Sequence, residues 1–117
     1  LKVFAVQSDA APAQHDSWHR KEPLTGQRIA TFAEGIATGG AYPMTFDTLR
    51  DGLADFIVVS DDAIAQSMAE LMDCTGNMPE AAGAAGFTGA KVLAPRLAGQ
   101  RVAVILCGGN ASLASLR

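Results

Sequence analysis

Asp55-Phe56-Ile57-Val58-Val59-Ser60-Asp61-Asp62-Ala63-Ile64 joins a short apolar run to the start of an amphipathic helix. The apolar residues from Phe56 to Val59 do not alternate with polar ones, which predicts a strand buried on both faces, as in a parallel sheet covered by helices. Ser60 or Asp61 can cap the helix that follows, and acids suit its positive end. The apolar positions of this helix recur at i, i+4, i+7 and i+8: Ile64, Met68, Leu71 and Met72.

Two further apolar runs, at residues 3–6 and 102–106, predict strands of the same kind. Helical patterns lie between the runs, at residues 12–20, from an N-cap at Thr45, and from Glu80 to about residue 93, whereas residues 22–42 have the glycine and proline content of an irregular crossing. We therefore predict an α/β fold, a small three-stranded parallel sheet with flanking helices, in a single domain over residues 1–117.

Composition and charge exclude several classes of protein. Hydrophobic residues make up 49% of the chain and charged residues 18%, enough apolar material for a core. The net charge is −3 and the positive residues are scattered, so neither nucleic acid nor an anionic membrane is an expected partner. The longest apolar run, residues 102–107, is far shorter than the about 20 residues that span a bilayer. Cys74 and Cys107 form no paired motif, and we expect a reducing, cytoplasmic setting.

Two glycine-rich segments are candidate binding sites. Cys107-Gly108-Gly109-Asn110 follows the last apolar run, and ligands of open parallel sheets bind beyond the carboxyl ends of strands. On residue types alone, a plain strand exit with a buried, inert cysteine explains it better. Glu80 precedes the small residues 81–86, which could bind phosphate at a helix start, but close packing is the more ordinary explanation.

His15 and His19 are spaced i, i+4 with Asp16 between them, which is close to the HExxH pattern of zinc proteases. A helix would place both rings on one face. Aspartate stands where the pattern has glutamate, and no third ligand follows. An exposed polar helix face is the simpler interpretation, with a metal-binding protein as the alternative.

In combination, these segments resemble the C-terminal part of a threonine/serine dehydratase-like enzyme. The family is the fold-type II, pyridoxal-phosphate-dependent one, which includes threonine ammonia-lyase, serine racemase and the tryptophan synthase β chain. The segments that carry the resemblance occur in the family's order and spacing: residues 2–7, 32–37, 45–51, 55–64, 79–85 and 104–110.

The resemblance implies a cofactor site at Cys107, Gly108, Gly109, Asn110, Gly35 and Glu80. In the family, a Ser or Cys that opens the [S/C]GGN turn lies opposite the pyridine nitrogen, which assigns that role to Cys107. A neutral partner there leaves the ring nitrogen unprotonated, which suits β-elimination. Gly35 would lie beside the ring, and Glu80 matches an acid near the pocket.

The family's Schiff-base lysine, its Ser-x-Lys segment and its tetraglycine phosphate loop have no counterpart in these residues. Lys2, Lys21 and Lys91 are the lysines present, and none stands in a matching motif. At the divalent-metal position of serine-racemase-like members the chain has Gln7 and Ala13 in place of acids, so that metal site is expected to be absent.

We therefore expect a C-terminal fragment of a PLP-dependent lyase, inactive alone, with no catalytic residue and no metal site of its own. The reaction implied is β-elimination of a hydroxy amino acid. The alternatives are a non-catalytic interaction module and a metal-binding protein that uses His15 and His19. Because truncation exposes sheet edges, we also expect a homodimer, or pairing with a complementary N-terminal segment. Its interface would use strand edges or the helix faces that carry Phe46, Leu49, Met68 and Met72.

Overall fold

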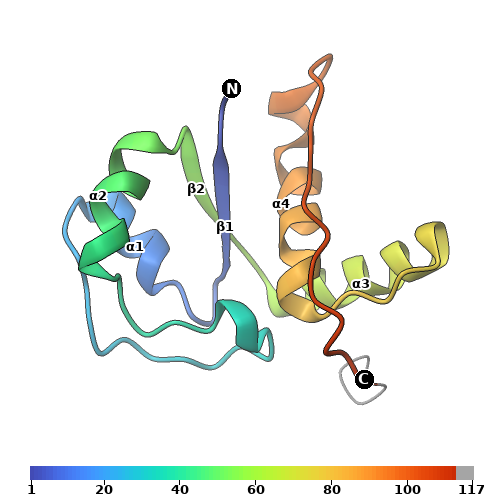
Figure 1. Cartoon of the computed structure of the whole chain (residues 1–117), viewed down its shortest axis with the longest axis horizontal. Coiled ribbons are helices and arrows are strands. Elements are labelled where there is room, and N and C mark those ends of the chain that lie inside the picture. The colour runs from blue at the N-terminus through green and yellow to red at the C-terminus, as the bar shows by residue number, and fades with distance from the viewer. Residues whose placement is uncertain (113–117) are drawn as a thin grey trace.

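Two parallel strands, β1 (Phe4–Ser8) and β2 (Asp55–Val59), form the centre of the computed structural model, which describes residues 1–112 (Figure 1). Phe4 lies opposite Asp55 and Ser8 opposite Val59. One further backbone bond extends the ladder beyond each end, from Ala54 N–H to the Val3 carbonyl at 2.8 Å and from Asp9 N–H to the Val59 carbonyl at 2.9 Å. The prediction of an α/β fold with parallel strands is confirmed.

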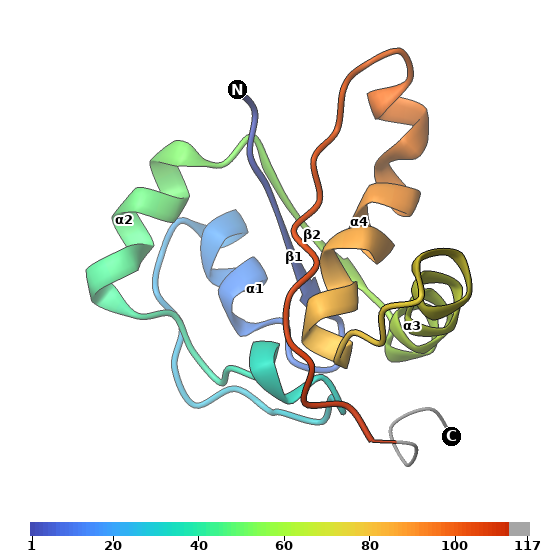
Figure 2. The ribbon, with the colours of Figure 1, turned by 45° about the vertical axis from the view of Figure 1, so that its right-hand side comes forward.

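Helices lie on both sides of this strand pair (Figures 1 and 2). On one side are α1 (Ala13–Arg20) and α2 (Pro43–Gly52), joined by an irregular crossing that contains the 3-10 turn η1 (Glu34–Ile36). On the other side are α3 (Asp61–Thr75) and α4 (Ala81–Leu97). The indole N–H of Trp18 on α1 donates to the Leu49 carbonyl on α2 at 3.0 Å.

The helix starts follow their local sequence, with one correction. Ser60 caps α3, and its hydroxyl accepts from Ala63 N–H at 3.2 Å, as predicted. The predicted N-cap at Thr45 is wrong, because α2 begins earlier, at Pro43. Proline suits a first helical position, since its φ is preset and the missing N–H would have no partner there.

The third predicted strand is also wrong. Residues 102–106 have no ladder partner among the described residues and instead run beside α4, as both ribbon views show (Figures 1 and 2). The backbone N–H and C=O groups of a helix are used internally, so α4 cannot serve as a strand partner. We call residues 101–112 the C-terminal segment. Several of its apolar side chains are 39–82% exposed: Val102, Val104, Ile105 and Leu106.

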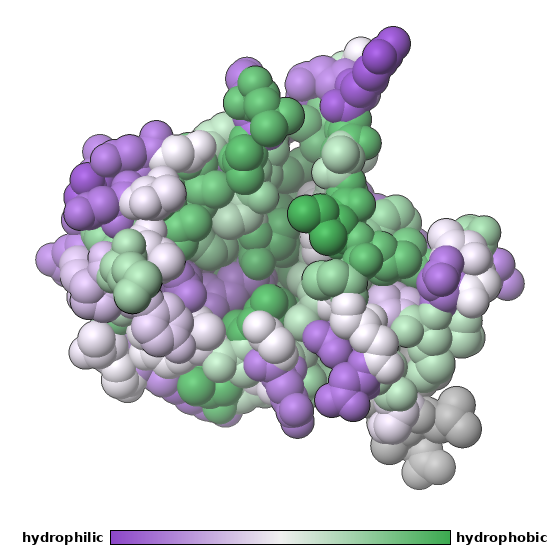
Figure 3. All heavy atoms as spheres, in the orientation of Figure 1, coloured by the Kyte–Doolittle hydropathy of each residue, from purple (hydrophilic) through white to green (hydrophobic). Residues whose placement is uncertain are grey.

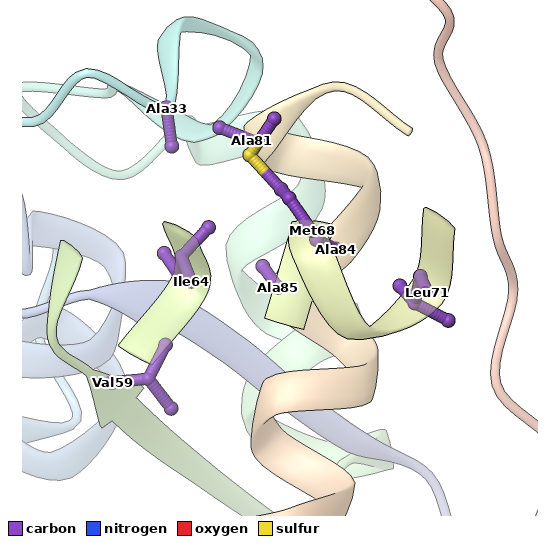
Figure 4. Packing of buried hydrophobic residues seen from close by; sticks show 8 residues of the cluster. All are labelled: Ala33, Val59, Ile64, Met68, Leu71, Ala81, Ala84 and Ala85. Carbon is purple, nitrogen blue, oxygen red and sulfur yellow. The ribbon is translucent and has the colours of Figure 1, made fainter. Parts of the chain in front are cut away.

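The core lies between the strands, α3 and the first half of α4 (Figure 4). Ile64, Met68 and Leu71 on α3 are buried, which confirms most of the predicted apolar face, whereas Met72 is 41% exposed. The rest of the cluster is Ala33, Val59, Ala81, Ala84 and Ala85. Of the four side chains expected at an association surface, Phe46 and Met68 are buried within the chain itself and are not available to a partner, whereas Leu49 and Met72 are partly exposed.

Apolar surface remains on the face where β1 and the C-terminal segment run (Figure 3). Leu1 and Val3 are exposed there at the N-terminal end. No helix within residues 1–112 has both the length and the apolar character needed to cross a bilayer.

Candidate functional site

A cavity of about 580 Å³ opens between the η1 turn, the start of α4 and the C-terminal segment. Its size lies within the roughly 300–1,000 Å³ of small-molecule sites. Three separate parts of the sequence line it: Phe32, Glu34 and Gly35; Glu80, Ala81 and Ala82; and Asn110, Ala111 and Ser112.

Glu80 joins the C-terminal segment to α4. It precedes the first helical residue with extended backbone, at φ −70° and ψ 166°, and its N–H donates to the Gly108 carbonyl at 3.1 Å. Its carboxylate oxygen Oε2 accepts from Asn110 N–H at 3.3 Å. Gly108 has a φ of +76°, and a Cβ there would collide with the Glu80 side chain, so the turn requires glycine on both grounds. The backbone of this turn and the Glu80 carboxylate therefore hold each other in place.

Gly35 brings the η1 turn against the start of α4. A Cβ at Gly35 would lie 2.8 Å from the Ala82 Cβ and 3.3 Å from Oε1 of Glu80. Any side chain at this position would push the turn away from α4 or project into the cavity. The glycine thus allows the η1 turn to approach the start of α4 closely at the edge of the cavity.

The small residues of α4 pack against neighbouring segments, which confirms the packing interpretation of this stretch. A Cβ at Gly83 would coincide with the Cys107 carbonyl, and one at Gly86 would lie 3.3 Å from the Val104 side chain. Gly89 faces Val6 of β1 in the same way. The glycines therefore let the C-terminal segment and β1 approach the helix closely.

The predicted site residues are brought together in part. Gly35, Glu80 and Asn110 line the cavity, and Gly108 contacts Glu80. Cys107 and Gly109 are not among its lining residues, and Cys107 is exposed where the simple strand-exit interpretation had it buried.

Sequence reasoning missed several lining residues. Phe32 and Glu34 flank Gly35 closely, and this adjacency was the one signal that could have found them. Ala81 and Ala82 belong to the small-residue stretch 81–86 that the sequence offered as a candidate helix-start site, whereas Ala111 and Ser112 stand in no such motif.

The two histidines pack and hydrogen-bond within the fold. His19 Nε2 donates to the Phe56 carbonyl at 2.9 Å, and His15 Nδ1 donates to Asp16 Oδ1 at 2.8 Å. Their ring centroids are 4.4 Å apart. Within residues 1–112, no group of three His, Cys, Asp or Glu side chains could hold a metal ion. The metal-binding alternative gains no support from this geometry.

Gln7 does not offer the ligands of a divalent cation. Its Oε1 accepts from the N–H groups of Gln14 and His15 at 3.2 and 3.1 Å, and its Nε2 donates to Thr38 Oγ1 at 2.9 Å. Ala13 is fully buried and has no ligand atom in its side chain. A hard cation needs free oxygen lone pairs, so these two residues do not fit one.

Residues 1–108 match the protein family described as "Pyridoxal-phosphate dependent enzyme". The chain belongs to this family. Its similarity to the biosynthetic L-threonine dehydratase of Escherichia coli (strain K12) is 30% identity over 119 residues, covering 100% of this chain and 23% of that protein. The L-threonine ammonia-lyase of Thermotoga maritima is 27% identical over 110 residues, covering 94% of this chain and 27% of that protein.

Solved structures of the family share the fold. The crystal structure of a T.th. threonine deaminase superposes with a TM-score of 0.87 at 26% identity, over 96% of this chain and 40% of that one. Maize serine racemase gives a TM-score of 0.87 at 25% identity, over 98% and 37%. The chain thus spans less than half of these structures, and 23% to 28% of the first curated relatives it matches.

The cavity has room for part of the family's cofactor. The cavity has the size of a small-molecule site, and Gly35 leaves free the space that a side chain would fill. None of the three lysines lines it: Lys91 Nζ bonds Glu70 at 2.7 Å and lies over the Phe87 ring. Lys2 and Lys21 are exposed elsewhere on the surface.

Proposed function

We propose that this chain forms one wall of the pyridoxal-phosphate site of a threonine/serine dehydratase-like lyase. The observation that carries the proposal is the close approach of Gly35 to Glu80 and Ala82 beside a ligand-sized cavity, in a chain of this family. When bound, the cofactor supplies the electron sink that lets a hydroxy amino acid lose its hydroxyl group and yield a 2-oxo acid and ammonia.

The residues of the chain would bind and orient rather than form the covalent link. Gly35 leaves room for a flat ring edge, and the Glu80 carboxylate is oriented by Asn110 N–H. Cys107 would place a neutral thiol opposite the ring nitrogen, as the family's turn does. That role requires its side chain to turn toward the cavity, which it does not line in this structure.

The lysine and the phosphate-binding loop would come from a segment outside residues 1–117, and the chain alone would be inactive. With pyridoxal phosphate, the chain alone should give no stoichiometric Schiff-base absorbance in the visible range, since its three lysines lie away from the cavity. A stoichiometric band that disappears when Lys2, Lys21 or Lys91 is replaced would contradict this. Two free cysteines, Cys74 and Cys107, fit a reducing compartment such as the cytoplasm.

The cofactor site can be tested with 4′-deoxypyridoxine 5′-phosphate, which keeps the ring nitrogen and phosphate but cannot form a Schiff base. We expect its NMR chemical-shift changes to fall on the amides of Gly35, Glu80, Ala82 and Asn110. Gly35→Val should weaken the binding at least ten-fold, because its side chain would enter the cavity. Gly52→Val is the matched control, since Gly52 faces open space. Shift changes confined to other residues, or unchanged binding by Gly35→Val, would refute the site.

Activity needs a second experiment. A separately supplied N-terminal segment bearing Ser-x-Lys and the glycine loop should restore threonine deamination when mixed with this chain. Chain with Gly35→Val should fail in that mixture, whereas Gly52→Val should work. Equal activity of the two mixtures would count against the proposed wall.

For the chain on its own we propose self-association as a homodimer. The support is that residues 102–106 have no ladder partner within residues 1–112, and that the side chains of Val3, Val102 and Ile105 are exposed. Unpaired extended backbone and contiguous apolar surface both favour pairing with another chain. Light scattering after size exclusion at micromolar concentration should give twice the chain mass. A cooperatively folding monomer would refute the proposal.

A further inference from the structure

The wall of the cavity that contains Gly35 has little structure of its own. Residues 31–38 include only the 3-10 turn η1. The backbone hydrogen bonds donated from Glu34, Ile36, Ala37 and Thr38 all end within the same segment. Its distance from α4 must therefore be set by packing and by side chains from other elements.

Asp61, the first residue of α3, holds the beginning of this segment. Its Oδ1 accepts from Thr31 Oγ1 at 2.7 Å and from Ser8 Oγ at 2.6 Å, and its Oδ2 accepts from Phe32 N–H at 3.1 Å. Ser8 is fully buried at the end of β1. One carboxylate therefore joins the loop, the sheet and α3, and hydrogen bonds to a charged acceptor are stronger than neutral ones.

Gln7 holds the end of the segment in the same manner. It is 3% exposed, and its Nε2 donates to Thr38 Oγ1 at 2.9 Å and to the Ile36 carbonyl at 3.4 Å. Its Oε1 accepts from the first N–H groups of α1. This position needs a side chain that donates on one side and accepts on the other, which an amide does and a carboxylate does not.

Between these two attachments, Ala33 is fully buried in the core and Ile36 packs against it. Gly35 lies between them and faces α4. A shift of the segment by even a few tenths of an ångström would change the contact of Gly35 with Ala82, where a Cβ would already lie at 2.8 Å.

We propose that Gln7 and Asp61 are positioning residues that set the distance of Gly35 from Ala82 and so the width of the candidate cofactor site. Neither residue lines the cavity. That this width matters for cofactor binding rests on the proposed function. The distance between Gly35 and Ala82 can be tested without any cofactor.

Gln7→Glu replaces the side-chain amide nitrogen with an oxygen, and Asp61→Asn replaces one carboxylate oxygen with an amide nitrogen. Both substitutions keep the shape of the side chain. The control variants are Gln66→Glu and Asp62→Asn, which make the same changes at exposed positions of α3. The first readout is the NOE between the Gly35 α-protons and the Ala82 methyl group. The second is the hydrogen-exchange protection of residues 32–38. We expect the first two variants to lose the NOE and at least ten-fold of this protection, and the controls to keep both.

The pH dependence of Gln7→Glu separates positioning from loss of structure. The ionised carboxylate of this variant would still accept from the α1 N–H groups but would face the Ile36 carbonyl with no proton to donate. Below the pKa of the introduced carboxyl, about 4.3 in model peptides and higher on burial, the protonated group could donate again. Titratable groups are linked to this position by hydrogen bonds: His15, whose N–H bonds Gln7 and whose ring bonds Asp16, and Asp61, which bonds the neighbouring Ser8. The wild type is therefore measured over the same pH range. The NOE should return in the variant as the pH falls.

Thr38→Val and Thr31→Val guard against variants that fail to fold, because each removes one of these hydrogen bonds from the loop side: the Thr38 bond to Gln7 or the Thr31 bond to Asp61. Thr31→Val also removes the acceptor of Ala33 N–H, so Thr38→Val is the cleaner of the two. Each should weaken the NOE while the protection of α3 and α4 stays within two-fold of the wild type. An unchanged NOE in the folded variants, or a Gln7→Glu variant that does not recover at low pH, would overturn the proposal. A lost NOE with unchanged binding of 4′-deoxypyridoxine 5′-phosphate would support the positioning role and count against the cofactor site.

Discussion

Gly83→Ala tests whether the C-terminal segment is seated on α4 by the absence of a side chain. The new Cβ would coincide with the Cys107 carbonyl, so either the helix or the segment must move. The helix is fixed by Ala81, Ala84 and Ala85 in the core. We therefore expect the segment to move away from the helix.

The size of the effect on stability follows from the hydrogen bonds that this movement breaks. The bonds lost are Glu80 N–H to the Gly108 carbonyl and Asn110 N–H to the Glu80 carboxylate. At about 0.5–1.5 kcal/mol each, they amount to roughly 1–3 kcal/mol. Alanine in place of glycine inside a helix returns about 1 kcal/mol. The global free energy of unfolding should therefore fall by no more than about 2 kcal/mol, while the segment itself is released.

Amide hydrogen exchange followed by NMR distinguishes these two effects. Loss of roughly 1–3 kcal/mol corresponds to about 5-fold to 150-fold faster exchange of the Glu80 and Asn110 amides, at 1.4 kcal/mol for each factor of ten. Amides in the middle of α3 should change far less. Gly86→Ala is the matched control, because its Cβ would meet the Val104 side chain at 3.3 Å, which can move, and the Ile105 carbonyl at 3.9 Å, which is ordinary contact. If the amides of Glu80 and Asn110 exchange as slowly in Gly83→Ala as in the wild type, the reasoning is refuted.

Three further predictions concern stability and are checked by urea unfolding. Gly89→Ala places a Cβ against Val6 and should lower the free energy of unfolding by about 1–3 kcal/mol through overpacking, offset by about 1 kcal/mol of helix propensity. Adding Val6→Ala to this variant should recover part of the loss. An unchanged free energy of unfolding in Gly89→Ala would contradict this prediction. Arg96 bonds Asp55 at 2.6 Å, and this hydrogen bond lowers the pKa of the Asp55 carboxyl, so the pair stabilises the fold above about pH 4 and loses this effect as the pH falls through the lowered pKa. Arg96→Met should therefore cost about 0.2–1 kcal/mol at pH 7, and this cost should shrink as the pH falls through the lowered pKa of Asp55. A difference that is constant from pH 7 down to pH 2 would contradict the linkage. Ser60→Ala removes the cap of α3 and should cost about 1 kcal/mol, whereas an unchanged midpoint would show that the cap contributes nothing.

The site residues that could be predicted are those that stand in a recognisable sequence motif. Gly35, Glu80 and Asn110 were all expected, through the family resemblance, and the structure brings them to one cavity. Phe32 and Ala111 line the same cavity but are ordinary residues whose place in it follows only from their neighbours in space. The place of Cys107 was not predictable either, because it depends on how the C-terminal segment lies on α4.

The sequence by itself determined the elements whose causes are local. The apolar runs at residues 3–6 and 56–59 form β1 and β2, and Ser60 caps α3, because burial pattern and capping act between residues close in the chain. Only the tertiary structure decided that residues 102–106, with the same composition, form no strand among the described residues. A strand exists by pairing with another strand, and this segment lies beside a helix whose backbone groups are already bonded.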